Sequence, residues 1–122
     1  MKKIVVVDDS DVIRSIVEQT LKLHKYDEIV SAVDGQDGLE KIKANLGNIA
    51  LLIFDVNMPK LDGISLVQEV RKLDSVTPII MLTTETDKAK MLTARDFGAT
   101  GWIVKPFDGD KFIKVVEMYL KA

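Results

Sequence analysis

Four short apolar runs in this chain each end in polar residues, and this pattern constrains the fold more than any other feature. The runs cover residues 4–7, 51–54, 79–82 and 102–104, and they are followed by Asp8 and Asp9, Asp55, Thr83, and Lys105. Continuous apolar runs of this length are typical of strands that are buried on both faces of a parallel sheet. The carboxyl ends of such strands meet at one edge of the sheet, so we expect these polar side chains to lie together.

Signals for strands and helices alternate along the whole chain. Strands are expected at residues 4–7, 29–33, 50–54, 79–82 and 101–104. Helices are expected after Ser10 with an apolar face at Val12, Ile13, Ile16, Val17, Thr20 and Leu21, then around 35–46, 63–73, 87–97 and 112–120. Ser10 is suited to cap the first helix, and Gly98 to end the fourth. Five strands alternating with five helices predict the α/β class, a five-stranded parallel sheet with helices on both faces.

Length and composition limit the kind of protein. The chain has 122 residues, so we expect one domain over residues 1–122 and no output domain. A net charge of −2 argues against a nucleic-acid partner, because phosphate contacts need a basic surface. The absence of cysteine excludes disulfides and thiolate metal sites, and it suits a reducing cytoplasm. No apolar run approaches the roughly 20 residues of a membrane helix, so we expect a cytoplasmic protein without a membrane segment.

Three aspartates at the expected sheet edge predict a metal site. Asp8, Asp9 and Asp55 would repel one another unless a cation were present. A set of oxygen ligands, in a chain without cysteine and with one histidine, favours Mg²⁺ or Mn²⁺ over zinc. Each residue alone has an ordinary explanation, such as a turn, a helix cap or, for Lys105, an exposed strand end. All of them occur at the ends of four strands, and the positive Lys105 accompanies the negative aspartates. This combination favours a site for a divalent metal and a phosphoryl group.

Four segments resemble the receiver domain of two-component response regulators. They are Val7-Asp8-Asp9-Ser10, Asp55-Val56-Asn57-Met58-Pro59, Leu82-Thr83-Thr84-Glu85 and Val104-Lys105-Pro106-Phe107. The resemblance covers the whole chain in order and spacing, and it implies the flavodoxin-like (βα)5 fold with strand order 2-1-3-4-5. That strand order is taken from known proteins of this class, a chemotaxis receiver among them, and not from these residues alone.

The resemblance also implies a role for each residue of the predicted site. Asp55 would accept a phosphoryl group from a histidine kinase or a small acyl phosphate, and Thr83 and Lys105 would contact the phosphoryl oxygens. Asp8, Asp9, Asp55 and the backbone carbonyl of Asn57 would hold Mg²⁺. Such a protein phosphorylates and dephosphorylates itself but is otherwise not an enzyme.

Other positions are implied to control switching and phosphoryl lifetime. Thr83 and Trp102 would form the switch, although the family usually has tyrosine or phenylalanine where this chain has Trp102. Asn57 and Glu85 would tune dephosphorylation and are similar to those of chemotaxis members. Thr84 is larger than the residue that is usual after the switch threonine. The Lys105-Pro106 bond is expected to be cis.

The leading hypothesis is a monomeric chemotaxis receiver. It would be phosphorylated by a chemotaxis-type histidine kinase, and it would bind a flagellar motor switch protein or a phosphatase through the face of the fourth helix, fifth strand and fifth helix, or act as a phosphate sink. Lys88, Lys90 and Arg95 would belong to a partner surface or to a merely solvated face. The alternative within signalling is a phosphorelay intermediate that passes its phosphoryl group to a histidine phosphotransfer protein.

Two further classes are disfavoured by particular residues. A flavodoxin-like electron carrier needs a hydroxyl-rich phosphate loop after the first strand, where Asp8, Asp9 and Asp11 would repel phosphate. A phosphohydrolase with an aspartyl nucleophile would have a second aspartate at position 57, where this chain has Asn57.

Overall fold

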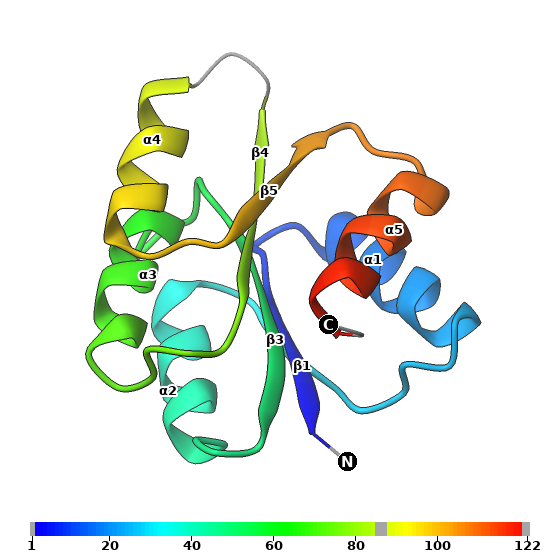
Figure 1. Cartoon of the computed structure of the whole chain (residues 1–122), viewed down its shortest axis with the longest axis horizontal. Coiled ribbons are helices and arrows are strands. Elements are labelled where there is room, and N and C mark those ends of the chain that lie inside the picture. Colours follow the sequence, from blue (N-terminus) through cyan, green and yellow to red (C-terminus); the bar gives the residue numbers. More distant parts are fainter. Residues whose placement is uncertain (1, 85–87, 121–122) are drawn as a thin grey trace.

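A five-stranded parallel sheet with helices on both faces forms the protein, in the strand order β2-β1-β3-β4-β5 that was predicted. The computed structural model describes residues 2–84 and 88–120. The strands are β1 (Lys3–Val7), β2 (Ile29–Ala32), β3 (Ile49–Asp55), β4 (Ile79–Thr84) and β5 (Gly101–Lys105). The helices are α1 (Asp11–Leu23), α2 (Gly35–Ala44), α3 (Gly63–Arg71), α4 (Lys88–Phe97) and α5 (Gly109–Leu120). Helices α1 and α5 cover one face of the sheet, and α2, α3 and α4 cover the other (Figure 1).

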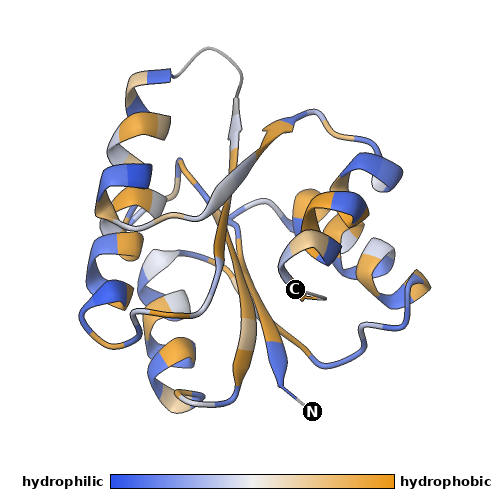
Figure 2. Ribbon diagram, in the orientation of Figure 1, coloured by the Kyte–Doolittle hydropathy of each residue, from blue (hydrophilic) through white to orange (hydrophobic). Residues whose placement is uncertain are grey.

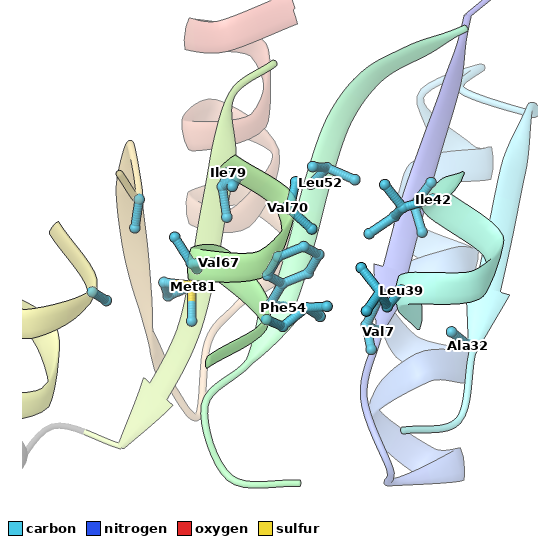
Figure 3. Close-up of a cluster of buried hydrophobic side chains, with 14 of the residues drawn as sticks. Val7, Ala32, Leu39, Ile42, Leu52, Phe54, Val67, Val70, Ile79 and Met81 are labelled. Carbon is cyan, nitrogen blue, oxygen red and sulfur yellow. The ribbon is translucent and has the colours of Figure 1, made fainter. Parts of the chain in front are cut away.

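The strands are apolar on both sides because both faces are covered. Successive residues of a strand point to opposite faces, so β1 sends Val5 and Val7 to one hydrophobic cluster and Ile4 and Val6 to another. The colouring of Figure 2 shows the resulting apolar character along the central strands. Figure 3 shows the first cluster, where Val7 and Phe54 of the sheet lie among side chains of α2 and α3.

Two of the expected helices end earlier than their apolar pattern indicates. Leu46 and Leu73 were predicted on helices, but α2 ends at Ala44 and α3 at Arg71, and both leucines are 43% exposed. After α2 the chain turns through Gly47, whose φ is +82°. After α3 the Asp74 carboxylate accepts hydrogen bonds from the backbone N–H groups of Val76 and Thr77. These turns compete with further helix, so the apolar residues there lie at the surface.

The predicted apolar face of α1 is wider than the face that is buried. Val17 and Leu21 are fully buried, whereas Val12 is 67% and Ile16 is 44% exposed. Successive residues are about 100° apart around a helix, so the two pairs lie on different sides of α1. Only Val17 and Leu21 belong to the buried cluster on the sheet. The expected cap is confirmed, because Ser10 Oγ accepts a hydrogen bond from the Ile13 N–H at 3.2 Å. None of the described helices is long and apolar enough to cross a membrane.

A lysine occupies the position at the end of α1 where glycine is preferred. The Lys25 N–H donates to the Lys22 carbonyl and the Tyr26 N–H to the Leu21 carbonyl, the pair of bonds that defines a Schellman motif. Lys25 therefore adopts a φ of +70°. A side chain in this left-handed conformation costs about 1 kcal/mol, a cost that glycine does not carry.

Replacing Lys25 by glycine should therefore stabilise the protein. We expect Lys25→Gly to raise the free energy of unfolding by about 0.5–1 kcal/mol, measured by urea denaturation. Lys22→Gly is the matched control, because Lys22 lies inside the last turn of α1. There glycine should lower stability by about 1 kcal/mol. Equal effects of the two substitutions would contradict this account of the α1 end.

Candidate functional site

The register of the strands brings the predicted polar residues to one edge of the sheet. Val7 of β1 pairs with Phe54 of β3, so Asp8 and Asp55 follow directly on neighbouring strands. Asp55 pairs with Leu82 of β4, which places Thr83 one residue beyond. Thr84 pairs with Lys105 of β5. The expected convergence of residues from four strands at the carboxyl edge is therefore observed.

Three carboxylates form the centre of this edge. Oxygen atoms of Asp8, Asp9 and Asp55 lie within 4.8 Å of one another. Asp8 is completely buried and Asp55 is 6% exposed, whereas Asp9 is exposed. The Ser10 N–H donates to Asp8 Oδ1 at 2.9 Å and so holds this carboxylate beside the start of α1. The group is open to solvent through Asp9 and closed on the side of the sheet.

Lys105 is the cation that faces these carboxylates. Its Nζ lies 2.8 Å from Asp55 Oδ1 and 3.4 Å from Asp8 Oδ2. Burial alone would lower the pKa of Lys105, but the hydrogen bond and charge of Asp55, together with Asp8, outweigh burial and raise it. The ammonium therefore stays charged at neutral pH.

A single lysine does not neutralise three carboxylates. Burial, followed by the charges of Asp8 and Asp9, raises the pKa of Asp55 despite the opposing hydrogen bond from Lys105. The edge thus retains an excess of negative charge in a partly buried place. Carboxylate oxygens are the ligands that hard divalent cations prefer, so the donor set fits Mg²⁺ or Mn²⁺.

The start of α3 is packed against the backbone of Asp55. The Gly63 N–H donates to the Val56 carbonyl at 2.8 Å, and a Cβ atom on Gly63 would lie 2.0 Å from the Asp55 carbonyl oxygen. Any larger residue at position 63 would have to displace the strand end that carries Asp55. The close approach explains why glycine follows Asp62, the residue whose side chain caps α3.

The remaining predicted residues of the site differ in how far they are exposed to solvent. Thr83 is 2% exposed on β4, while Trp102 of β5, paired with Met81, is 38% exposed. Asn57 lies on the surface, and its Oδ1 accepts a hydrogen bond from Lys90 Nζ at 3.1 Å. Glu85 lies outside the described residues. The Lys105-Pro106 peptide bond is cis, as expected.

Sequence reasoning missed one contact to the acidic edge. Arg14 of α1 donates from Nη1 to the Asp8 carbonyl oxygen at 2.6 Å and pairs with the Asp11 carboxylate. A bond to a backbone carbonyl leaves no signature in residue types. The only available signal was an arginine in the second turn of a helix that begins just after Asp8.

Comparison with known proteins identifies the family. The model for the response regulator receiver domain matches residues 4–117. The chain belongs to this family. Chemotaxis protein CheY1 of Helicobacter pylori is 40% identical over 121 residues, which are 97% of this chain and 96% of that protein.

Solved structures and longer relatives agree with this assignment. The receiver domain superposes on chemotaxis protein CheY4 of Vibrio cholerae with a TM-score of 0.89 and 40% identity, over 98% of this chain and 99% of that one. A probable transcriptional regulator, ycf27 of Porphyridium aerugineum, is 44% identical over 87% of this chain but only 42% of its own length. The chain is thus a CheY-like receiver domain, consistent with chemotaxis, in a family of signalling proteins.

Removing the Asp55 charge should stabilise the metal-free receiver domain. Its raised pKa means that the ionised form costs free energy in the folded state. This cost is complete above the folded pKa, shrinks as the pH falls, and is gone below the pKa of the unfolded chain. We therefore expect Asp55→Asn to have a higher free energy of unfolding than the wild type at neutral pH, in buffer that contains a chelator. The difference between the two free energies should become smaller as the pH is lowered.

Asp27→Asn is the control for this measurement, because Asp27 is exposed and outside the acidic edge. Urea denaturation of both variants and the wild type gives the comparison. An Asp55→Asn variant that is less stable than the wild type would show that the ion pair with Lys105 outweighs burial and repulsion.

Proposed function

We propose that this receiver domain accepts a phosphoryl group on Asp55 and signals through changed affinity for partner proteins. The observation that carries the proposal is the position of Asp55, buried between two further carboxylates with Lys105 Nζ 2.8 Å from its Oδ1. A carboxylate held against a charged lysine is a suitable nucleophile when the lysine can also neutralise the incoming group.

In the proposed reaction, the phosphoryl group passes from the leaving group of a donor to Asp55. An Asp55 carboxylate oxygen forms a bond to phosphorus, while the bond to the imidazole nitrogen of a kinase phosphohistidine, or to the carboxylate of an acyl phosphate, breaks. The electron pair of the broken bond stays on that leaving group. Lys105 would pair with one phosphoryl oxygen and the Thr83 hydroxyl would donate to another, which stabilises the charge that moves onto the protein.

Asp8, Asp9, Asp55 and the backbone carbonyl of Asn57 would hold Mg²⁺, which supplies positive charge to the phosphoryl oxygens during transfer. The excess negative charge of the acidic edge supports this assignment.

The face of α4, β5 and α5 is the proposed contact for the output partner. Trp102 and Val104 of β5 are 38% and 37% exposed. They line a cavity of about 360 Å³ together with Phe107, Lys111 and Val115. Thr83 lies on β4 next to β5, where it pairs with Val104, so a movement of Thr83 toward the phosphoryl group would act on the strand that carries Trp102. Because relatives of this chain are chemotaxis proteins, we propose a histidine kinase and a flagellar motor switch protein or phosphatase as its partners.

Phosphorylation can be tested by intact mass. Incubation with Mg²⁺ and a small acyl phosphate should add one phosphoryl group to the wild type, and none to Asp55→Asn. Asp27→Asn should be modified like the wild type, because Asp27 is an exposed carboxylate outside the site. A modified Asp55→Asn variant would place the acceptor elsewhere, and an unmodified wild type would contradict the proposed function.

The proposed switch can be followed by tryptophan fluorescence, because Trp102 is the only tryptophan of the chain. Beryllofluoride, a stable mimic of the phosphoryl group, should change the Trp102 emission in the presence of Mg²⁺. The change should disappear in Asp55→Asn, and it should be reduced in Thr83→Ala while beryllofluoride still binds. If the full emission change remained in Thr83→Ala, Trp102 would respond to beryllofluoride independently of Thr83, which would contradict the proposed switch.

A further inference from the structure

A lysine of α4 is hydrogen-bonded to the loop that follows the acceptor strand. Lys90 Nζ donates to Asn57 Oδ1 at 3.1 Å, across 33 residues of sequence. Asn57 is two residues beyond Asp55, and Lys90 lies in the first turn of α4. The two side chains line a cavity of about 320 Å³ beside the acceptor loop, together with Val56, Asp62, Ile64 and Ser65.

The lysine determines which way the Asn57 amide points. An asparagine side chain has one accepting end, Oδ1, and one donating end, the NH₂ group, whereas a lysine ammonium only donates. A bond from Lys90 therefore holds the carbonyl end of the amide toward α4. The other end, the NH₂ group, points away from this bond.

Asp62, the acidic residue that lines the same cavity, already accepts two hydrogen bonds from Ser65. Asp62 accepts from the N–H and from the hydroxyl of Ser65, both at 2.9 Å. Burial raises the pKa of Asp62, but these hydrogen bonds outweigh it and hold the pKa below its ordinary value. Asp62 is thus an anion that caps α3. Lys90 is the cation of this cavity, and its ammonium reaches the Asn57 amide.

We propose that Lys90 is a positioning residue that slows the loss of the phosphoryl group by holding the Asn57 side chain. This inference rests on the proposed function. In hydrolysis a water oxygen bonds to phosphorus, the bond from phosphorus to the Asp55 oxygen breaks, and its electron pair returns to the carboxylate. The water proton passes to solvent or to the phosphate that leaves.

Hydrogen-bond acceptors near Asp55 promote this step by orienting the attacking water. Asn57 Oδ1 is an acceptor on the loop two residues beyond Asp55, but the bond from Lys90 holds it toward α4. Without Lys90, the amide can rotate and turn its carbonyl end toward a water molecule beside Asp55. Lys90 therefore lengthens the lifetime of the phosphorylated state by holding Asn57 Oδ1 toward α4.

The test compares the decay of phosphorylated variants. Each protein is loaded with a small acyl phosphate and Mg²⁺, the donor is removed, and phosphoryl loss is followed by intact mass and by released inorganic phosphate. We expect Lys90→Met to lose its phosphoryl group roughly three- to tenfold faster than the wild type, the effect of one hydrogen bond. Lys90→Arg should retain the slow rate. Lys88→Met, a neighbouring exposed lysine of α4, should behave like the wild type.

A double-mutant comparison separates action through Asn57 from a general effect of charge. In an Asn57→Ala background, Lys90→Met should leave the rate of phosphoryl loss unchanged. An equal acceleration in both backgrounds would overturn the inference, as would a Lys90→Met variant that decays at the wild-type rate or more slowly. In these cases the proteins are still phosphorylated, so the proposed function stands. A wild type that takes up no phosphoryl group would overturn both.

Discussion

Crowding of like charges at one edge of the sheet is the constraint on which the rest of the structure depends. Asp8, Asp9 and Asp55 bring their oxygens within 4.8 Å, and Lys105 supplies one compensating charge. Such an arrangement costs free energy, because burial opposes ionisation and neighbouring carboxylates repel. The apolar clusters on both faces of the sheet offset this cost and keep the strand ends together. The excess negative charge fits the edge to a divalent cation, and Lys105 is the group that would pair with a phosphoryl oxygen in the proposed function.

The parallel sheet explains why these residues meet although they are far apart in sequence. Every crossover returns the chain to the same end of the sheet, so the residue after each strand arrives at the same edge. The alternation of side chains between the two faces of each strand adds a second condition for the site. Val7 and Phe54 point into one cluster, and the next residue on each strand, Asp8 or Asp55, begins the site. A shift of one residue in β3 would exchange the buried and site-forming positions.

The parts of the structure that follow from local rules could be predicted from the sequence. Continuous apolar runs identified the strands, and their polar endings identified Asp8, Asp9, Asp55, Thr83 and Lys105 as neighbours. Contacts between elements could not be predicted in the same way. The exposure of Val12 and Ile16 depends on how α1 lies on the sheet, and the ends of α2 and α3 depend on competing turns. The bond from Arg14 to the Asp8 carbonyl involves a backbone atom that every residue has.

The position of α4 connects the acidic edge with the proposed output face. Near its start, Lys90 is bonded to Asn57 of the acceptor loop. Just after its end, the Gly98 carbonyl accepts from Arg71 Nε and Nη2 of α3 at 3.0 and 2.9 Å, and the φ of +117° at Gly98 suits a residue without a side chain. The first attachment joins the start of α4 to the loop after Asp55, and the second joins the end of α4 to α3. A change at the acceptor loop would therefore act on the start of α4, a helix of the proposed output face, where a partner of unequal affinity can select one arrangement.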